Sequence, residues 1–496
     1  MRILFFNIAF LLCLHLVKAQ SLGGLPFNSS IRTFNFASLY AFEQVPSFSY
    51  VNTSMHAFEG NFNRPQTPAS GILGGFEANG RKRQNKLIWE GRFSWQYQRD
   101  KGQQWNNTSR HPDALPYIWA DETVGTWARN HFKSSVQVGT TMTGNLQFGA
   151  GLLFEGGQGN RLNDPRPLYR FRELGIAPEL ALRVKKTNWL AVQLLYLSFS
   201  EDNEIGFFSV DDPLLFRLRG PATFTRTPFV SGERQLNSQQ IGGGLRWVSE
   251  KQFAAQFRGT VSWGKAEEGV AIITPGGKWQ ILNASLLLQK SWQGKLRNSF
   301  SLSGNIVQNE GTDPTFQAIN TRLQITKIGL AFQISKPDST AFHWSLRTMA
   351  NWQVRSQEDL ATFTETNLQQ LPLSLHLDGK WLKGKLRPFL LLHGHYQALL
   401  SENLQIGSPT FISENLLLPD FEILSSEFFS IGTGIGLDIG QGAKKFRFLL
   451  FARHIQSLGA SQLFNQQHAG LSITFIPGST LYLPKLFQGA SNFGIF

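Results

Sequence analysis

The stretch KLIWEGRFSWQYQ, residues 86–98, decides the fold. Apolar, aromatic or glycine residues occupy every second position from Leu87 to Tyr97, and mostly polar side chains such as Glu90, Arg92 and Ser94 lie between them. A period of two is typical of a β-strand that has one apolar and one polar face. The stretch therefore predicts a long strand that lies between an apolar and a polar environment.

The same alternation recurs along the chain. It is clearest in NLQFGAGLLF (145–154), FAAQFRGTVSW (253–263), ILNASLLLQ (281–289), SLSGNI (301–306) and FSIGTGIGLDI (429–439). Short turns join such segments in pairs, at 143–144, 186–188, 251–252, 294, 337–339, 384 and 440–442. Longer connections, rich in charge, Pro and Gly, separate the pairs at 100–130, 156–171, 202–236 and 402–426.

A closed barrel explains this alternation of short turns and long connections. The segments give single strands near 48–60 and 466–476, and eight hairpins that begin near 71, 131, 171, 236, 278, 321, 367 and 426. We predict an all-β fold: a closed antiparallel transmembrane β-barrel of about 18 strands (roughly 16–20), with short periplasmic turns and long extracellular loops. The alternative is a large soluble all-β protein, whose apolar face would need a second covering layer.

The N-terminus predicts export. Arg2 precedes an apolar run from Ile3 to Val17, so residues 1–19 are typical of a signal peptide cleaved after Ala19. The single cysteine, Cys13, lies within this leader, which excludes disulfides and thiolate chemistry from the mature chain.

The remaining chain divides into three predicted parts. We expect residues 20–47 to form an N-terminal periplasmic segment, 48–476 the transmembrane β-barrel, and 477–496 a C-terminal tail or final short strand. The predicted location is the cell outer membrane.

The net charge limits the classes of partner that we expect the protein to bind. The chain carries 47 Lys and Arg against 34 Asp and Glu, a formal charge of +13. The excess is dispersed and the chain is exported, so we expect outer-membrane lipids, lipopolysaccharide or an anionic solute as partners, and no nucleic acid.

The leader, the cysteine-free body, the aromatic-flanked strands and the paired turns together resemble Gram-negative outer-membrane β-barrel proteins. The junction Val17-Lys18-Ala19-Gln20 is similar to those of Bacteroidota, and the loop segment NDPRPLYRFRELG (163–175) resembles an uncharacterised Bacteroidota outer-membrane barrel family. That resemblance implies a barrel and no known activity. Phe496 fits the aromatic last residue of such barrels, but Pro477 and Pro484 separate it from the last clear strand.

A set of inward arginines is the first candidate site. Alternation places Arg92, Arg246, Arg258, Arg297, Arg347, Arg355, Arg447 and Arg453 on the polar face, as a basic lumen lining that favours anions. The alternative is that these arginines pair with inward acids such as Glu90, Glu155 or Asp438 and brace the barrel.

Histidines on one hairpin are the second candidate. If the turn around Gly384 holds four residues, His376 faces His393, and these two with His395 and Asp378 are candidate metal ligands. The alternative is that they are solvated wall residues. We expect no cofactor and no enzymatic activity, because His454 and Ser457, three residues apart on a strand, point to opposite faces.

These features predict a passive channel or transport component for small solutes, among them anions. The alternative is a non-conducting barrel subunit of an outer-membrane complex with surface lipoproteins or export machinery. Inward folding of the 202–236 connection, which carries Phe207, Phe208, Phe216 and Phe224, would narrow or shut the pore. A membrane-interface girdle is predicted from Trp89, Trp189, Trp247, Trp263, Trp279, Trp292, Trp344, Trp352 and Trp381.

Overall fold

The computed structural model describes residues 47–476, except 111, 186–187, 207–213, 229–231, 250–251, 270–271, 337–340, 441–444 and 459–463. The predicted signal peptide, nearly all of the predicted periplasmic segment and the C-terminal tail lie outside the described residues, as do Phe207 and Phe208.

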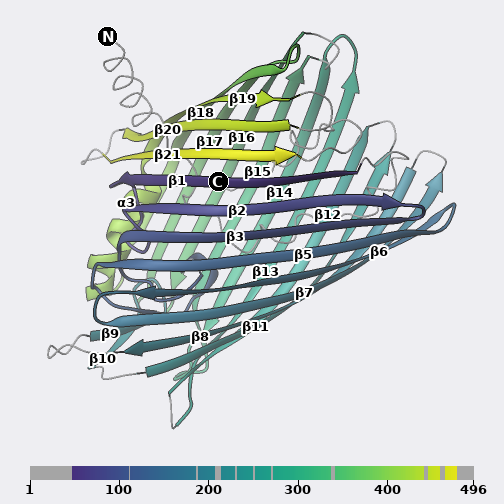
Figure 1. Cartoon of the computed structure of the whole chain (residues 1–496). Helices are drawn as coiled ribbons and strands as arrows, with labels where there is room; N and C mark the ends of the chain where they lie inside the picture. The colour runs from purple at the N-terminus through teal and green to yellow at the C-terminus, as the bar shows by residue number, and fades with distance from the viewer. Residues whose placement is uncertain are drawn as a thin grey trace, which may run out of the picture.

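Eighteen long antiparallel strands form one sheet (Figure 1). They are β1 (Phe48–Gly60), β2 (Ser70–Gln84), β3 (Leu87–Gln103), β5 (Gly125–Thr143), β6 (Leu146–Arg161), β7 (Arg166–Lys185), β8 (Asn188–Gly206), β11 (Gly232–Ser249), β12 (Phe253–Glu268), β13 (Thr274–Gln293), β14 (Arg297–Thr312), β15 (Ile319–Ser335), β16 (Phe342–Asp359), β17 (Thr364–Trp381), β18 (Leu386–Gln405), β19 (Glu427–Ile439), β20 (Lys445–Leu458) and β21 (Asn465–Ile476). Each strand pairs with its neighbours in chain order.

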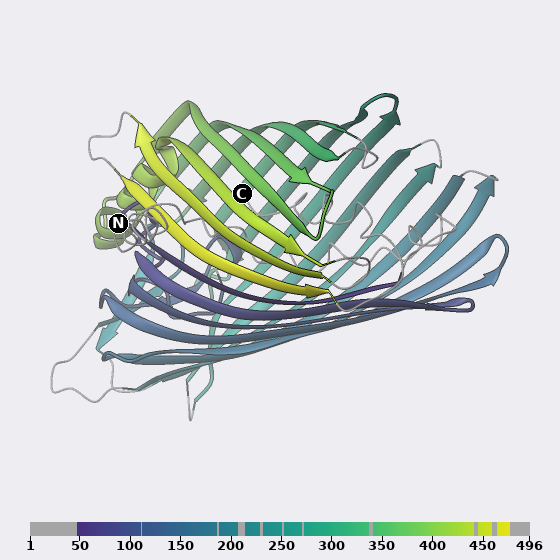
Figure 2. The ribbon, with the colours of Figure 1, turned by 45° about the horizontal axis from the view of Figure 1, so that its top comes forward.

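The sheet closes on itself. The first and last strands, β1 and β21, pair in antiparallel register from Val51↔Phe475 to Gly60↔Gln466. Closure leaves no exposed edge in the sheet, which is what a strand in hydrocarbon requires. The predicted closed barrel of about 18 strands is confirmed, and Figure 2 shows its wall curving back on itself.

The outer wall carries an apolar belt. On β12, Phe253 and Trp263 are both exposed on the outward face, ten residues apart. At about 3.3 Å per residue and a strand tilt of about 40°, that separation spans about 25 Å, the height of an outer-membrane apolar band. Trp89, Trp292, Trp352 and Trp381 are exposed in the same way. Trp189 and Trp279 were expected in the girdle, but they are 2% and 3% exposed and pack inside the barrel. No helix among the described residues is both long and apolar enough to cross a membrane.

The wall continues past this belt at the end where the long connections lie, here called the long-loop end. The predicted long connection at 156–171 is wrong, because β6 runs to Arg161 and β7 begins at Arg166. The outward face is polar there, with Arg170 paired to Glu204 across to β8 at 2.6 Å. The apolar side chains of β7 in this region, Tyr169 and Phe171, face inward, which is the reverse of the alternation in the belt and explains why the hydropathy pattern missed the strand.

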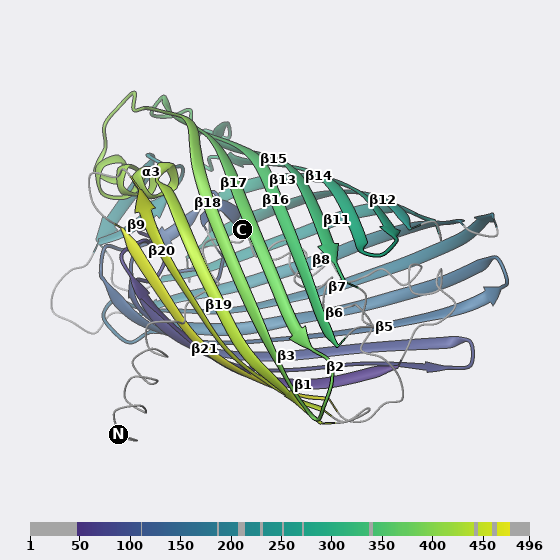
Figure 3. The same ribbon diagram turned by 90° about the horizontal axis from the view of Figure 1, so that it is seen from above.

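Smaller elements gather at the long-loop end (Figure 3). The connection after β3 holds a short 3-10 helix, η2 (Pro112–Ala114), and β4 (Ile118–Ala120). The connection after β8 holds β9 (Leu214–Leu218) and β10 (Phe224–Pro228), which form a second sheet with β4. The connection after β18 holds η3 (Ser413–Leu417) and α3 (Leu418–Ser425).

The belt predicts that a charged side chain on the outer face destabilises the barrel by an amount that depends on its position. Leu245, 51% exposed on the outward face of β11, lies within the belt, so Leu245→Arg should lower the free energy of unfolding by about 2–4 kcal/mol. The measurement is denaturant unfolding from lipid bilayers, followed by tryptophan fluorescence. The matched control is Gln235→Arg on the same face beyond the belt, beside Asp202, which should cost little. Equal effects of the two substitutions would contradict a membrane-embedded belt.

Candidate functional site: the barrel interior and its closed mouth

One connection crosses the mouth of the barrel. Residues 104–124 leave the wall between β3 and β5, yet the Tyr117 hydroxyl donates a hydrogen bond to Asn320 on β15 at 2.7 Å. In the strand order, β15 lies almost opposite β3 and β5. Gly277 on β13 adopts φ +129°, and a Cβ there would lie 2.5 Å from the Tyr117 ring. This glycine allows the crossing connection to lie directly against the wall.

A chain of charges holds three connections to the wall. Asp113, in the crossing connection, accepts hydrogen bonds from Arg355 of β16 at 2.8 and 2.9 Å and from Arg64 at 3.0 and 3.2 Å. Arg64 belongs to the connection after β1, and it also donates to Asp420 of α3 at 2.6 and 2.8 Å. The chain Arg355–Asp113–Arg64–Asp420 is therefore the interaction that ties these connections together.

Arg64 keeps its positive charge within this series of ion pairs. Burial by itself lowers the pKa of the guanidinium, but Asp113 and Asp420 outweigh that effect and hold the pKa above its ordinary value. Removing one carboxylate would leave buried positive charge without its compensation.

Further carboxylates of the wall form hydrogen bonds or ion pairs with the connections. Asp359 of β16 accepts backbone hydrogen bonds from Ala222 at 3.0 Å and Thr223 at 2.7 Å, in the turn between β9 and β10. Glu173 of β7 pairs with Arg110 at 2.6 Å. The wall thus presents carboxylates that the folded connections satisfy.

An apolar core fills the space beneath these contacts. Phe216 of β9 is fully buried and lies 5.2 Å from Trp105 and 5.6 Å from Phe411, between ring centroids. The cluster joins these connections to inward residues of six wall strands, such as Tyr169 and Trp279. The described part of the 202–236 connection thus turns inward at Phe216, and folded chain crosses the long-loop end of the barrel.

The predicted basic lining lies on the inner wall, where its members differ in their partners. Alternation with exposed outward residues places all eight arginines inward. Those with carboxylate partners are Arg92 with Glu77 (3.2 Å), Arg355 with Asp113 (2.8 Å) and Arg447 with Asp438 (2.7 Å). Arg258 donates to Gln193 at 3.3 Å, and Arg453 donates to Ser430. Arg246 lies close enough to Glu179 for electrostatic interaction, while Arg297 and Arg347 stand opposite Ser335 and His376.

Ion pairs with inward acids therefore account for some of the eight inward arginines. The acids named from the sequence are paired, since Glu90 contacts Arg81, Glu155 contacts Lys133 at 3.5 Å, and Asp438 also accepts from Lys380 at 2.5 Å.

The candidate metal ligands are only partly brought together. The turn after β17 holds four residues, and His376 faces His393 as predicted, with ring centroids 4.3 Å apart. His395 shares a hydrogen bond with Ser374, and Asp378 accepts one from Ser345 at 3.3 Å. No group of three His, Cys, Asp or Glu side chains in the described ranges is placed to hold a metal ion.

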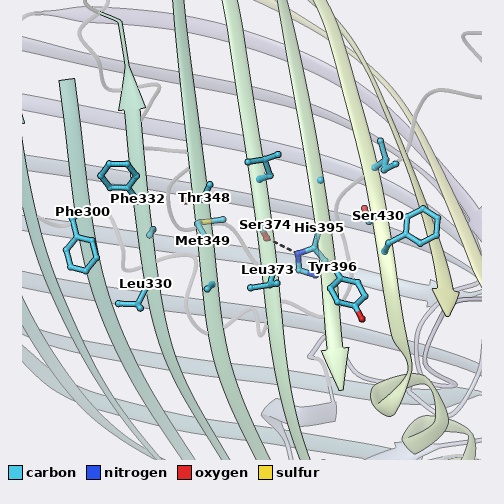
Figure 4. Close-up of a pocket in the computed structure, with 16 residues that line it drawn as sticks. Phe300, Leu330, Phe332, Thr348, Met349, Leu373, Ser374, His395, Tyr396 and Ser430 are labelled. Atoms are coloured by element: carbon cyan, nitrogen blue, oxygen red, sulfur yellow. Dashed lines mark hydrogen bonds between the residues drawn. The ribbon is translucent and has the colours of Figure 1, made fainter. Parts of the chain in front are cut away.

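A hollow of about 620 Å³ lies over β14–β19, and alternation alone does not reveal it (Figure 4). Apolar side chains such as Phe300, Phe332 and Tyr396 line it, and the Ser374 hydroxyl lies 2.8 Å from His395 Nδ1 at its floor. Most lining residues belong to the outward belt, so we expect lipid chains to cover the hollow. His454 and Ser457, the pair considered from sequence, alternate to opposite faces of β20.

Comparisons with known proteins give one family and several distant structural likenesses. One family model, described as a family of unknown function (DUF6850), matches residues 37–476. No curated protein matches the sequence significantly. Among solved structures, the ferric preacinetobactin receptor BauA from Acinetobacter baumannii is 8% identical, with 87% of this chain and 80% of that chain covered and a TM-score of 0.41.

Two further solved structures are similar to the same degree. The alcaligin outer membrane receptor FauA from Bordetella pertussis is 8% identical, with coverage of 86% and 75% and a TM-score of 0.42. Pseudomonas aeruginosa OccK5 is 10% identical, with coverage of 87% and 98% and a TM-score of 0.33. At these identities and scores, the likenesses carry no argument about function.

The charge chain predicts how the mouth opens. Asp113→Asn leaves Arg64 and Arg355 poorly compensated, so the closed arrangement should lose about 3–5 kcal/mol. Hydrogen exchange followed by mass spectrometry should show faster exchange in residues 104–124, with strand protection unchanged. Glu204→Gln, at the exposed pair with Arg170, is the control and should change exchange little. Unchanged exchange in the Asp113 variant would show that the charge chain does not hold the mouth.

Proposed function

We propose that this protein, which belongs to the family of unknown function DUF6850, is an outer-membrane transport barrel for small anionic solutes. Its long-loop end stays closed until the connections that cover it move. The observation that carries the proposal is a polar inner wall with eight inward arginines, beneath a mouth that ion pairs and hydrogen bonds tie to the wall in addition to its apolar core. Such contacts contribute about 1.5–3 kcal/mol each when charged, so the mouth can be closed at rest yet open without unfolding the wall.

The dimensions of the barrel support a pathway. A barrel of this strand number has room for more than packed side chains. The strong positive charge of the chain favours anions in a confined, polar interior. Because the proposed passive route is closed at one end at rest, we expect its conductance to be lower than that of a permanently open channel.

The apolar belt supports an outer-membrane location. We propose that the signal peptide directs export and that the long-loop end faces outward, since the first residue of β1, Phe48, and the last residue of β21, Ile476, both lie at the short-turn end. Lipopolysaccharide is the proposed neighbour of the polar strand ends beyond the belt.

A second function is favoured by one observation, the packed cluster around Phe216 and Trp105. A mouth filled by an apolar core resembles a domain interior, which fits a non-conducting subunit that presents its long-loop end to a surface lipoprotein.

Planar bilayer recordings test the proposal. The unaltered protein should show rare, brief openings, and Arg355→Gln, which removes the wall anchor of Asp113, should raise the open probability about tenfold or more. Glu204→Gln is the matched control and should behave as the unaltered protein. Reversal potentials in a salt gradient should show anion preference.

The outcomes separate the two functions. The absence of current in both the unaltered protein and Arg355→Gln, at every voltage, would refute the transport proposal. A lipoprotein that co-purifies in a fixed ratio with the non-conducting barrel would support the subunit.

A further inference from the structure

The hollow over β14–β19 arises from the sizes of the outward side chains. Thr348 and Ala350 of β16 and Gly394 of β18 are small, and they lie among larger apolar residues. Figure 4 shows Phe332 and Tyr396 on opposite sides of the hollow, with Thr348 between them. The outer wall is therefore recessed here, within the apolar belt.

The hollow has the volume of a ligand site. Its volume of about 620 Å³ lies within the range of about 300–1,000 Å³ that is usual for small-molecule sites. A Cβ built on Gly394 would lie 4.0 Å from the Cβ of Leu375, an ordinary contact that leaves room above this glycine. A gap in the wall forfeits dispersion contacts with the surrounding hydrocarbon, and a chain that fits the gap restores them.

The hollow runs diagonally across the belt. One line of cross-strand neighbours follows it, formed by Lys290, Phe300, Phe332, Thr348, Leu375 and Gly394. Lys290 is close to the short-turn end of β13, at Gln293, whereas Gly394 is farther from the corresponding end of β18, at Leu386. The line thus leads from the short-turn edge of the belt toward its middle, the direction that a lipid chain takes from its headgroup.

Lys290 lies at the level of the lipid headgroups. It is exposed, and it belongs to the same outward face of β13 as Leu286 and Trp292. Its second cross-strand neighbour is Phe253, at the short-turn edge of the belt. The Trp292 ring lies 6.3 Å from that of Phe332, between centroids, and tryptophan is enriched where hydrocarbon meets headgroups.

The short-turn edge beside the hollow is positively charged. The segments 286–300, 330–346 and 376–392 contribute five lysines to it, Lys290, Lys295, Lys336, Lys383 and Lys385. In the described parts of these three segments, the only carboxylate is that of Asp378, which faces inward and accepts a hydrogen bond from Ser345. Lysines at a membrane surface attract anionic lipids.

We propose that the hollow binds one phospholipid with an anionic headgroup, its acyl chain along the line from Phe300 to Gly394 and its phosphate at Lys290. An ammonium group offers three donors, so Lys290 can contact the phosphate beside its neighbours in the wall. The site rests on the proposed outer-membrane location and not on solute transport. With the short-turn end in the periplasm, the lipid belongs to the periplasmic leaflet.

Native mass spectrometry tests the site without requiring conduction. The protein purified from membranes and freed of co-purified lipid is titrated, at one detergent concentration, with phosphatidylglycerol and separately with phosphatidylcholine of the same chain length. The unaltered protein should bind a first phosphatidylglycerol more tightly than later ones and more tightly than phosphatidylcholine. Lys290→Gln should lower this preference about fivefold, the effect of one lysine near an anionic lipid surface.

A second variant keeps every charge. Gly394→Leu fills the hollow and should remove the tight first binding by exclusion alone. Gly91→Leu places the same side chain on the outward face of β3, where a Cβ meets open space, and should leave binding unchanged. Lys278→Gln removes an exposed lysine from the long-loop end of the same face of β13 and should also leave it unchanged. Heat-modifiable mobility on gels confirms that each variant retains the barrel.

The outcomes separate the lipid site from the transport function. Equal binding of the two lipids, or equal weakening by Gly394→Leu and Gly91→Leu, would overturn the site. Tighter binding of lipopolysaccharide than of phosphatidylglycerol, lost in Gly394→Leu, would overturn the assignment to a phospholipid. Selective binding of phosphatidylglycerol by a barrel that carries no current would support the site while the transport proposal fails. Anion-selective current without such binding would overturn the site alone.

Discussion

The hydrogen bonding of the strand backbone is the constraint on which the rest of this molecule depends. Backbone groups that lack partners in hydrocarbon cost several kcal/mol each, so the first strand must pair with the last, as Val51 does with Phe475. Closure at this strand number then fixes an interior wider than wall side chains can fill. The inner wall must therefore tolerate water or be covered by chain, and both solutions are present in different parts of the barrel.

At the long-loop end, the interior is covered, and the covering depends on charge pairing. Buried charges destabilise a fold unless each has a partner, and the chain from Arg355 through Asp113 and Arg64 to Asp420 provides those partners across three connections. The apolar cluster beneath it adds packing that ion pairs alone do not give. Farther along the wall, polar and basic residues such as Arg258 face the interior instead.

The sequence predicts the wall well because alternation is a local property. Eighteen strands, the paired turns and the His376–His393 register follow from a period of two and a four-residue turn. Contacts of the covering connections could not be predicted, since Arg64 and Asp420 are 356 residues apart and share no local pattern. Trp189 and Trp279 were misplaced because an aromatic ring near a strand end suits either face.

The extension of the strands beyond the apolar belt separates two mechanical environments. Lipid acts on the belt, where a change in bilayer thickness would tilt or compress the strands. Carboxylates that anchor the covering connections, such as Asp359 and Glu268, are the last residues of their strands, and the strand registers place Glu268 level with the polar outer face around Arg170 and Glu204. Tension or thickness of the membrane would therefore reach the closure only weakly, and opening would respond instead to what contacts the rim from the aqueous side.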